Sequence, residues 1–344
     1  MHKIVAAVIL LGFCFACQDE VKENTAHGMR LAIDWYEDGK TVESGVQANI
    51  VATGFIWSEG PVWSEETKSL LISDVPGNII YQWSKEKGQQ VYLKHAGFSD
   101  TLDHRGSDGS NGLAFDRSGT LVICQSGARR VVRMKAPPGA LTAEYEVLAD
   151  NYQGKKFNSP NDLVIDRNNA IYFTDPVYGL PEEEKDSSRE MNYEGVYRIS
   201  PDGSVRLLID SISRPNGITL SPDEKTLYIS SSDEKMPAWY AYQLSDSFTI
   251  VSGGIILDAL PLREKAIVKQ SPDGLKIGKD GNIYASGPEG ISIISPTGKL
   301  LGLIKVKDRY TSNCAFNSQK DTLYITADDL VLQVPMEQVV KRGK

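Results

Sequence analysis

The stretch PNGITLSPDEKTLYIS, from Pro215 to Ser230, decides the fold because five other stretches of the chain repeat its design. A polar residue stands near its head, and a short polar turn separates two apolar segments. Apolar segments of this length on either side of a polar turn are typical of antiparallel strands. The other five runs are EGPVWSEETKSLLIS (Glu59–Ser73), SNGLAFDRSGTLVIC (Ser110–Cys124), PNDLVIDRNNAIYFT (Pro160–Thr174), PDGLKIGKDGNIYAS (Pro272–Ser286) and SNCAFNSQKDTLYIT (Ser312–Thr326).

The leading polar residues of the six runs recur at similar intervals, with spacings of 52, 50, 55, 57 and 40 residues. A repeat of this size, with several short strands in each unit, is typical of β-propellers. We therefore predict an all-β fold, a six-bladed β-propeller around a central channel. Rotation about the channel axis brings residues far apart in sequence to one mouth of the channel. These leading residues are Glu59, Asn111, Asn161, Asn216, Asp273 and Asn313.

Residues 48–344 are predicted to form this propeller as a single domain. Helical periodicity of useful length is absent, and residues 336–340 are the only weak helical candidate. Two segments, 97–110 and 181–193, interrupt the repeats with polar and charged residues. They are predicted to be surface loops, either solvated connections, which are commoner, or covers over the channel mouth.

The N-terminus is predicted to be a targeting segment rather than part of the fold. A positive start and a short apolar stretch indicate a signal peptide over residues 1–16. Cys17 follows Ala16 in a way that resembles the bacterial lipoprotein processing site, so we predict lipidation of Cys17, with plain cleavage near Ala16 as the alternative. Residues 17–47 are predicted to be an irregular leader that contributes at most an edge strand. The chain is therefore expected to be exported, either periplasmic or anchored to the bacterial envelope by a lipid.

The net charge of −8 disfavours nucleic acid as a partner, because a phosphate-binding surface needs a basic excess. The only membrane contact that the sequence predicts is the N-terminal lipid. Two cysteines, Cys124 and Cys314, remain outside the signal. Because two blades would separate them around the ring, we predict that both are buried free thiols.

Four of the leading residues carry oxygen ligands. Glu59 and Asp273 offer carboxylates, and Asn161 and Asn216 offer amide carbonyls. Such a mixture suits a divalent cation of the Ca²⁺ type, whereas zinc would need His or Cys. Ordinary turn chemistry is the alternative for each Asn or Asp, but it explains neither their recurrence nor Glu59. The four residues therefore predict a metal site in the central channel.

With their surroundings, these residues make the chain resemble the family of gluconolactonase, senescence marker protein and luciferin-regenerating enzyme. The resemblance covers roughly residues 54–334 and implies a six-bladed propeller with a divalent metal in its channel. The family's metal ligands fall on Glu59, Asn161, Asn216 and Asp273, the same four residues. The stretches that carry it are SEGPVW (Ser58–Trp63), NSPNDLVIDRNNAIYFTDPVYGL (Asn158–Leu180), EGVYRISPDG (Glu194–Gly203), RPNGITLSPDEKTLYIS (Arg214–Ser230) and SPDGLKIGKDGNIYASGPEGISIISPTG (Ser271–Gly298).

The resemblance implies calcium-dependent hydrolysis of a small-molecule lactone, such as glucono-1,5-lactone. Asp273 is the implied base that takes the proton of the attacking water. Asn111 and Tyr178 are expected to contact the substrate. Two other functions stay open: a phosphotriesterase like diisopropyl fluorophosphatase, and a non-catalytic exported propeller with structural calcium.

The chain departs from the family at two places. Bacterial gluconolactonases usually have a Glu-His pair in the second repeat, where this chain has Gln125 and Ser126. Animal members carry an arginine at the position of Ser159. Both changes bear on the specificity for sugar lactones more than on the metal site.

Overall fold

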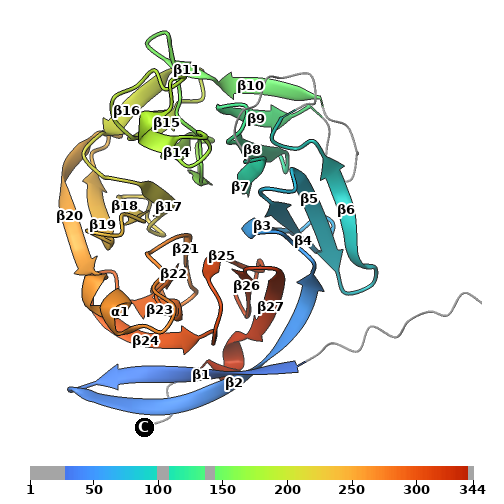
Figure 1. Ribbon diagram of the computed structural model, residues 1–344, viewed down its shortest axis with the longest axis vertical. Helices are drawn as coiled ribbons and strands as arrows, with labels where there is room; N and C mark the ends of the chain where they lie inside the picture. Colours follow the sequence, from blue (N-terminus) through green and yellow to red (C-terminus); the bar gives the residue numbers. More distant parts are fainter. Residues whose placement is uncertain (1–27, 99–107, 136–143, 340–344) are drawn as a thin grey trace, which may run out of the picture.

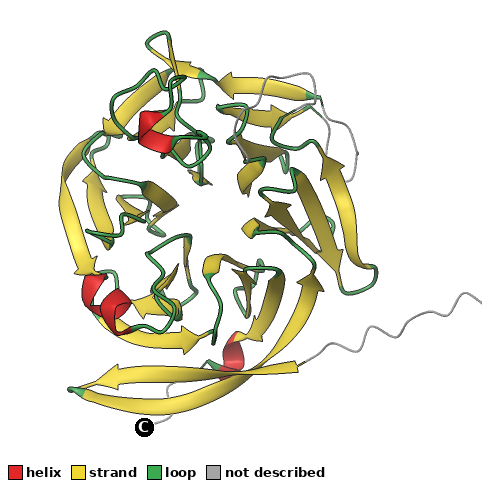
Figure 2. Cartoon of the chain, in the orientation of Figure 1, coloured by secondary structure: helices red, strands yellow, loops and turns green. Residues whose placement is uncertain are grey.

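The computed structural model describes residues 28–98, 108–135 and 144–339, which form a ring of β-sheets (Figure 1). Strands dominate the ring, and helix is confined to short pieces among the described residues (Figure 2). The all-β prediction is confirmed. The 3₁₀ turn η2 (Met336–Gln338) lies at the weak helical signal, whereas no sequence signal predicts the six-residue α1 (Leu260–Lys265).

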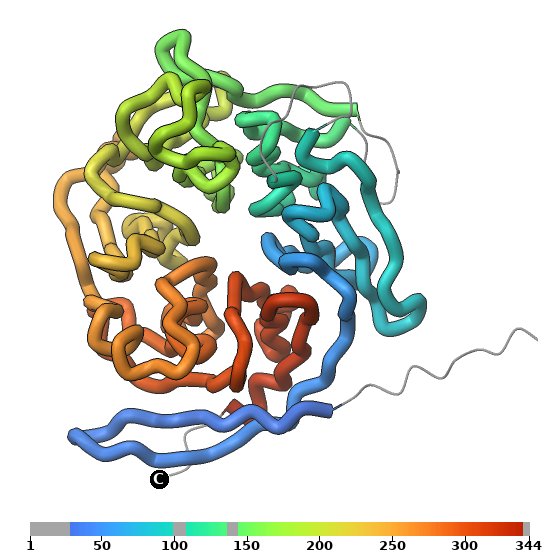
Figure 3. The backbone as a smooth tube through the Cα atoms, in the orientation of Figure 1, coloured from blue at the N-terminus to red at the C-terminus, as the bar shows by residue number. Residues whose placement is uncertain are grey.

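Four antiparallel sheets of four strands follow one another around the ring in chain order (Figure 3). A nine-stranded sheet, in the order β21-β22-β23-β24-β1-β2-β27-β26-β25, completes the ring, and β11 (Asn151–Tyr152) and β12 (Lys155–Lys156) form a separate hairpin. The four-stranded sheets are β3 (Ser58–Ser64), β4 (Ser69–Asp74), β5 (Ile79–Ser84) and β6 (Gly88–Lys94); β7 (Ser110–Phe115), β8 (Leu121–Gln125), β9 (Arg130–Met134) and β10 (Tyr145–Ala149); β13 (Leu163–Ile165), β14 (Ile171–Asp175), β15 (Gly195–Ile199) and β16 (Val205–Ile209); and β17 (Pro215–Leu220), β18 (Thr226–Ser231), β19 (Ala238–Leu244) and β20 (Ile250–Asp258).

The nine-stranded sheet contains the last two repeats. Its strands are β21 (Leu275–Ile277), β22 (Ile283–Gly287), β23 (Gly290–Ile294), β24 (Leu300–Lys305), β25 (Thr311–Phe316), β26 (Thr322–Ala327), β27 (Leu330–Pro335), β1 (Gly28–Glu37) and β2 (Lys40–Thr53). The first strand of each repeat stands nearest the centre of the ring (Figure 1). In the order β3, β7, β13, β17, β21 and β25, each of these inner strands contacts the next, and β25 contacts β3.

A serine or threonine hydroxyl joins neighbouring units at this inner layer. Thr174 Oγ1 donates to the backbone carbonyl of Asn216 at 2.6 Å, and Ser73 Oγ donates to that of Asn111 at 2.7 Å. Because donors and acceptors are buried, these bonds satisfy groups that water cannot reach. The equivalent bonds elsewhere run from Ser230 to Asp273, from Ser286 to Ser312 and from Ser312 to Ser58.

The hydroxyls of Ser73, Thr174, Ser230 and Ser286 belong to the last residues of the repeated runs. The second run ends in Cys124 instead, and there Ser126 Oγ donates to the carbonyl of Pro160 at 2.6 Å. The run ends are therefore a sequence signature of contact between units.

The glycine after a leading residue is required by the close approach of the next unit. A Cβ at Gly217 would lie 2.4 Å from the carbonyl oxygen of Asp273. A Cβ at Gly60, where φ is +52°, would lie 2.1 Å from the carbonyl oxygen of Asn111. No side chain fits at such distances, so these two glycines allow the inner strands to pack around the channel.

The prediction of an irregular leader is wrong for residues 28–47. Strands β1 and β2 form a long hairpin, in which β2 pairs with β27 and β1 pairs with β24. The hairpin thus links the last two repeats and ties the N-terminal part of the described chain to the C-terminal part. Leu31, Ile33 and Trp35 are buried and alternate in sequence with Arg30, Ala32 and Asp34, which is the period-2 pattern of a strand.

Both predicted free thiols are confirmed, because Cys124 and Cys314 are buried and unpaired. Within the described ranges, no helix is long and apolar enough to cross a membrane. The predicted signal peptide and the lipidation site Cys17 lie outside the described residues.

Replacing Thr174 with valine removes the hydroxyl but keeps the shape of the side chain. The buried carbonyl of Asn216 loses its donor, so we expect the free energy of unfolding to fall by about 2 kcal/mol. Urea denaturation measures this change. Thr226→Val is the control, since its hydroxyl bonds to the side chains of Gln243 and Tyr228 and to no buried backbone carbonyl, and it should stay within about 0.5 kcal/mol of wild type. Equal stability of Thr174→Val and wild type would contradict a stabilising role for the bond.

Candidate functional site

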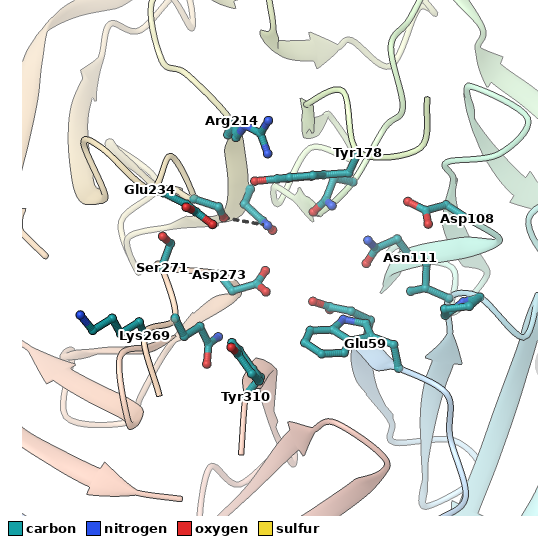
Figure 4. Close-up of a pocket in the computed structure, with 17 residues that line it drawn as sticks. Glu59, Asp108, Asn111, Tyr178, Arg214, Glu234, Lys269, Ser271, Asp273 and Tyr310 are labelled. Atoms are coloured by element: carbon teal, nitrogen blue, oxygen red, sulfur yellow. Dashed lines mark hydrogen bonds between the residues drawn. The ribbon is translucent and has the colours of Figure 1, made fainter. Parts of the chain in front are cut away.

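Five of the six leading residues line a cavity of about 470 Å³ at the end of the ring where the inner strands begin (Figure 4), and the sixth, Asn313, donates a hydrogen bond to Glu59. Glu59 comes from β3, Asn216 from β17, and Asp273 directly precedes β21. The structure thereby brings together residues that the repeat spacing placed at one mouth. All six predicted site residues line the cavity: Glu59, Asn111, Asn161, Tyr178, Asn216 and Asp273.

Two buried carboxyl groups form the floor of the site. Glu59 Oε2 accepts hydrogen bonds from the backbone N–H of Gly60 at 2.6 Å and from Asn313 Nδ2 at 3.1 Å. Asp273 Oδ1 is buried and has no hydrogen-bond partner among the described residues. Burial raises the pKa of the Glu59 carboxyl to about 7. Burial and the neighbouring charge of Glu59 raise the pKa of Asp273 well above its usual range.

The amide of Asn216 is held by its neighbours. Its Nδ2 donates to Ser232 Oγ at 3.0 Å, and Ser232 Oγ donates to the carbonyl of Pro272 at 2.6 Å. Hydrogen bonding from Asn216 also lowers the pKa of Asp273 against the effect of burial. Since the amide nitrogen is used as a donor, the Oδ1 atom of Asn216 is the one left for a ligand.

Tyr178 lines another side of the cavity. It lies in a loop that Ser159 holds in place by two hydrogen bonds. Ser159 Oγ accepts a bond from the N–H of Gly179 at 2.9 Å and donates to the carbonyl of Pro176 at 2.6 Å. Ser159 therefore positions the loop and does not itself line the cavity. Burial raises the pKa of the Tyr178 hydroxyl, while hydrogen bonding with Ser232 lowers it.

The charged insertion 181–193 contacts the site through Arg214. The Arg214 guanidinium carbon lies 5.3 Å from the centroid of the Tyr178 ring. Arg214 Nη2 also pairs with Glu183 Oε2 at 2.5 Å and with Glu184 Oε1 at 2.8 Å, at η1 (Glu183–Lys185). Part of the predicted surface loop therefore contacts Arg214, and Arg214 in turn contacts the Tyr178 ring in the cavity wall.

Gln125 and Ser126, which stand where bacterial gluconolactonases usually have a Glu-His pair, form hydrogen bonds inside the protein. Gln125 Nε2 donates to the carbonyl of Ala96 at 2.6 Å, and its Oε1 accepts a bond from Arg130 Nε at 2.6 Å. Ser126 makes the bond to Pro160 described above. Neither residue is among the described residues that line the cavity.

Sequence reasoning missed several cavity residues, including Trp57, Asp108, Arg214, Glu234 and Tyr310. Three lining residues, Trp57, Arg214 and Ser271, stand two positions before a leading residue. Aligning the repeats at that offset would have found them. Asp108, Glu234 and Tyr310 lie in connections that the repeat pattern does not constrain.

The floor of the cavity fits a hard divalent cation. Glu59, Asp273, Asn161 and Asn216 all line this one cavity, and the unpartnered Oδ1 of Asp273 is an orphan that a cation would satisfy. Among the described residues, no group of three or more His, Cys, Asp or Glu is arranged to hold a metal. Binding would therefore depend on the amide oxygens as well, which Ca²⁺ accepts and zinc does not prefer.

A buried ion pair lies near this floor. Lys276 Nζ is 3.4 Å from Asp162 Oδ2, and the Asp162 side chain is only 3% exposed. The charge of Asp162 raises the pKa values of Glu59 and Asp273, and that of Lys276 lowers the pKa of Glu59. Lys276, with 25% of its side chain exposed, thus lies beside Asp162 and near Glu59.

Comparison with known proteins places the chain beside lactone-hydrolysing enzymes. The profile of the SMP-30/Gluconolactonase/LRE-like region matches residues 57–329. The gluconolactonase of Zymomonas mobilis is 40% identical over 288 residues, which is 83% of this chain and 80% of that protein. The structure of a gluconolactonase from Xanthomonas campestris superposes with a TM-score of 0.72 and 30% identity, covering 84% of this chain and 89% of the other. A calcium-binding regucalcin from Agrobacterium tumefaciens shares the fold, with a TM-score of 0.63 and 16% identity over 83% of this chain and 92% of its own.

Lys276→Met leaves the buried carboxylate of Asp162 without its cation. We expect the free energy of unfolding to fall by about 3 kcal/mol, because an unpaired buried charge is costly. Chemical denaturation at pH 7 without added metal is the measurement. Lys279→Met makes the same change at an exposed position of the following turn and should be neutral within about 0.5 kcal/mol. If the two variants are equally stable, the ion pair does not support the fold.

Proposed function

The chain belongs to the SMP-30/Gluconolactonase/LRE-like family, and from that premise we propose that it is a calcium-dependent lactonase. The observation that carries the proposal is the meeting of Glu59, Asn161, Asn216 and Asp273 at one cavity, with Asp273 Oδ1 unpartnered. The names of the relatives support the reaction, since the Zymomonas and Xanthomonas proteins are both gluconolactonases.

The architecture that we propose is a six-bladed propeller with a metal in its channel. The closed succession of six inner strands supports it. In this interpretation β21–β24 form the fifth blade, and β25–β27 form the sixth, which β2 completes as its outer strand. The long nine-stranded sheet is then two blades joined by β1.

Glu59, Asn161, Asn216 and Asp273 would hold the cation, which we propose to be Ca²⁺. When bound, Ca²⁺ supplies Lewis-acid polarisation of the lactone carbonyl and stabilises the negative charge that develops on its oxygen. Asn313, whose amide donates to Glu59, and Ser232, which fixes Asn216, keep the ligands oriented.

Asp273 is the proposed base of the reaction. Its carboxylate takes a proton from water as that water attacks the carbonyl carbon. The bond between the carbonyl carbon and the ring oxygen then breaks, the ring oxygen takes up a proton, and the product is a hydroxy acid. Asn111 and Tyr178, which line the cavity near the two carboxyls, are proposed to hold the substrate.

The first substrate that we propose is a sugar lactone such as glucono-1,5-lactone. Polar side chains on several sides of the cavity, among them Asp108, Asn111 and Glu234, offer partners for its hydroxyl groups. The enzyme is further proposed to be exported, with Cys17 as the lipid anchor. That part of the proposal rests on the sequence of residues 1–27 alone.

Removal of the metal should stop the reaction. We expect the purified protein to release acid from glucono-1,5-lactone well above spontaneous hydrolysis when Ca²⁺ is present, and to fall to background after chelation. Re-addition of Ca²⁺ should restore the rate and raise the melting temperature, because a ligand that binds only the folded state stabilises it. A pH-stat follows acid release. Unchanged release in chelator would exclude a catalytic metal, and absence of release with Ca²⁺ bound would exclude this lactone.

Asp273→Asn should lower kcat by about 10²- to 10⁴-fold, the usual contribution of a general base, while the ring stays folded. The steady-state rate with glucono-1,5-lactone and the circular dichroism spectrum measure the two properties. Asp246→Asn, the same change at an exposed turn, is the control and should retain the wild-type rate. A folded Asp273→Asn protein with wild-type kcat would rule out Asp273 as the base.

A further inference from the structure

One side of the cavity is apolar, in contrast to the rest of its lining. Trp57, Val75, Pro76 and Tyr310 all line it there. Trp57 and Tyr310 lie with ring centroids 6.3 Å apart and planes tilted by 51°. Ile56, which directly precedes Trp57 in the chain, is 67% exposed. We call these five residues the apolar wall.

Polar groups line the rest of the cavity, and Lys269 lies beside Tyr310 in Figure 4. Arg214, Tyr178 and Glu234 lie across the two carboxyls from Tyr310 in the view of Figure 4. The cavity therefore has a polar side that the proposed reaction uses and an apolar side that it does not use. A ligand that fills both sides is amphipathic.

The apolar wall is held in place by backbone contacts. The N–H groups of Ile56 and Trp57 both donate to Asp74 Oδ1 at 3.1 Å, and the N–H of Val75 donates to the carbonyl of Trp57 at 3.1 Å. On the other side, the N–H of Tyr310 donates to Asp328 Oδ2 at 3.1 Å. A preformed apolar surface loses little conformational entropy on binding, so its contact area contributes directly to affinity.

Among the described residues, large exposed hydrophobic side chains stand on outer strands of the sheets, as at Val91, and in connections away from the cavity, as at Met236 and Ile267. Tyr310, with 45% of its surface exposed, lines the cavity, and Ile56, with 67% exposed, is the neighbour in sequence of the lining residue Trp57. Exposed apolar surface beside a cavity is typical of a ligand contact.

We propose that the apolar wall binds an apolar substituent of the substrate, so that the preferred substrate is an amphipathic lactone with an alkyl or aryl group on its ring. This proposal rests on the proposed lactonase function. The ester would lie at Glu59 and Asp273, and the substituent would lie along Trp57 and Tyr310 toward Ile56. The cavity volume of about 470 Å³ lies within the roughly 300–1,000 Å³ of sites for ligands larger than a single small ring.

A simple polyhydroxylated lactone leaves this surface unused, because its hydroxyl groups find no partner at Ile56, Val75 or Pro76. A membrane surface is a weaker match, since the chain carries a net charge of −8 and anionic lipids attract basic segments. An apolar group attached to the lactone itself uses both sides of the cavity at once.

Two lactones that share one ring provide the test. δ-Valerolactone and δ-decanolactone are the same six-membered cyclic ester, and only the second carries a pentyl chain. We expect kcat/KM of the intact protein with Ca²⁺ to be at least about 10-fold higher for δ-decanolactone, because even one methylene in an apolar pocket is worth about 10-fold or more. In Tyr310→Ser and in Ile56→Ser this preference should fall toward 1. Val91→Ser, at an exposed position of an outer strand, should keep it.

A binding measurement tests the role of the apolar wall independently of the reaction. Calorimetric titration of the Asp273→Asn protein with each lactone should show tighter binding of δ-decanolactone, and Tyr310→Ser in that background should remove the difference. Equal kcat/KM and equal affinity for the two lactones would overturn the proposal. Tyr310-dependent sedimentation with neutral phosphatidylcholine vesicles, without a preference between the lactones, would also overturn it and assign the surface to a membrane. Preferential binding without turnover of any lactone would support the apolar wall and overturn the proposed function instead.

Discussion

A hydroxyl-to-carbonyl hydrogen bond between neighbouring units is the interaction on which the rest of the structure depends. Thr174, Ser73 and their equivalents donate to the backbone carbonyls of residues such as Asn216, Asn111 and Asp273. These three acceptors line the cavity, and each of the remaining acceptors stands directly before a leading residue. A single buried contact therefore closes the ring and fixes where each site residue leaves the backbone. The glycines that follow the acceptors let the inner strands approach closely enough to form it.

The floor of the cavity carries acidic groups that a folded interior ordinarily avoids. Glu59 and Asp162 are buried, the Oδ1 atom of Asp273 beside them is also buried, and Lys276 forms an ion pair with Asp162. Burial of carboxyl groups with one neighbouring cation is unfavourable unless a further positive group is bound. The surrounding strands are stabilised by the apolar core and by the bonds between units. A site of this kind is where function is expected to oppose stability.

The walls of the cavity have a different origin from its floor. Connections between strands supply Tyr178, Glu234 and Tyr310, and the charged insertion 181–193 supports Tyr178 through Arg214. These segments differ in length and composition from unit to unit, whereas the inner strands repeat. The floor is therefore suited to one kind of chemistry, and the walls decide which molecule is brought to it.

The sequence by itself determined the strand repeats, the inner position of the leading residues and their meeting at one mouth, because rotation about an axis turns a regular spacing into proximity. The oxygen ligands of Glu59, Asn161, Asn216 and Asp273 predicted a metal site, and the resemblance to a family assigned the same four residues to it. The pairing of the β1–β2 hairpin was not predictable, because its partners β24 and β27 lie near the other end of the chain. Only the tertiary structure decided that Gln125 and Ser126 form hydrogen bonds inside the protein. It also decided that Lys276 pairs with Asp162 and that the rings of Trp57 and Tyr310 lie side by side. Those contacts join segments from different units, and no local pattern of residues specifies which connection packs against which.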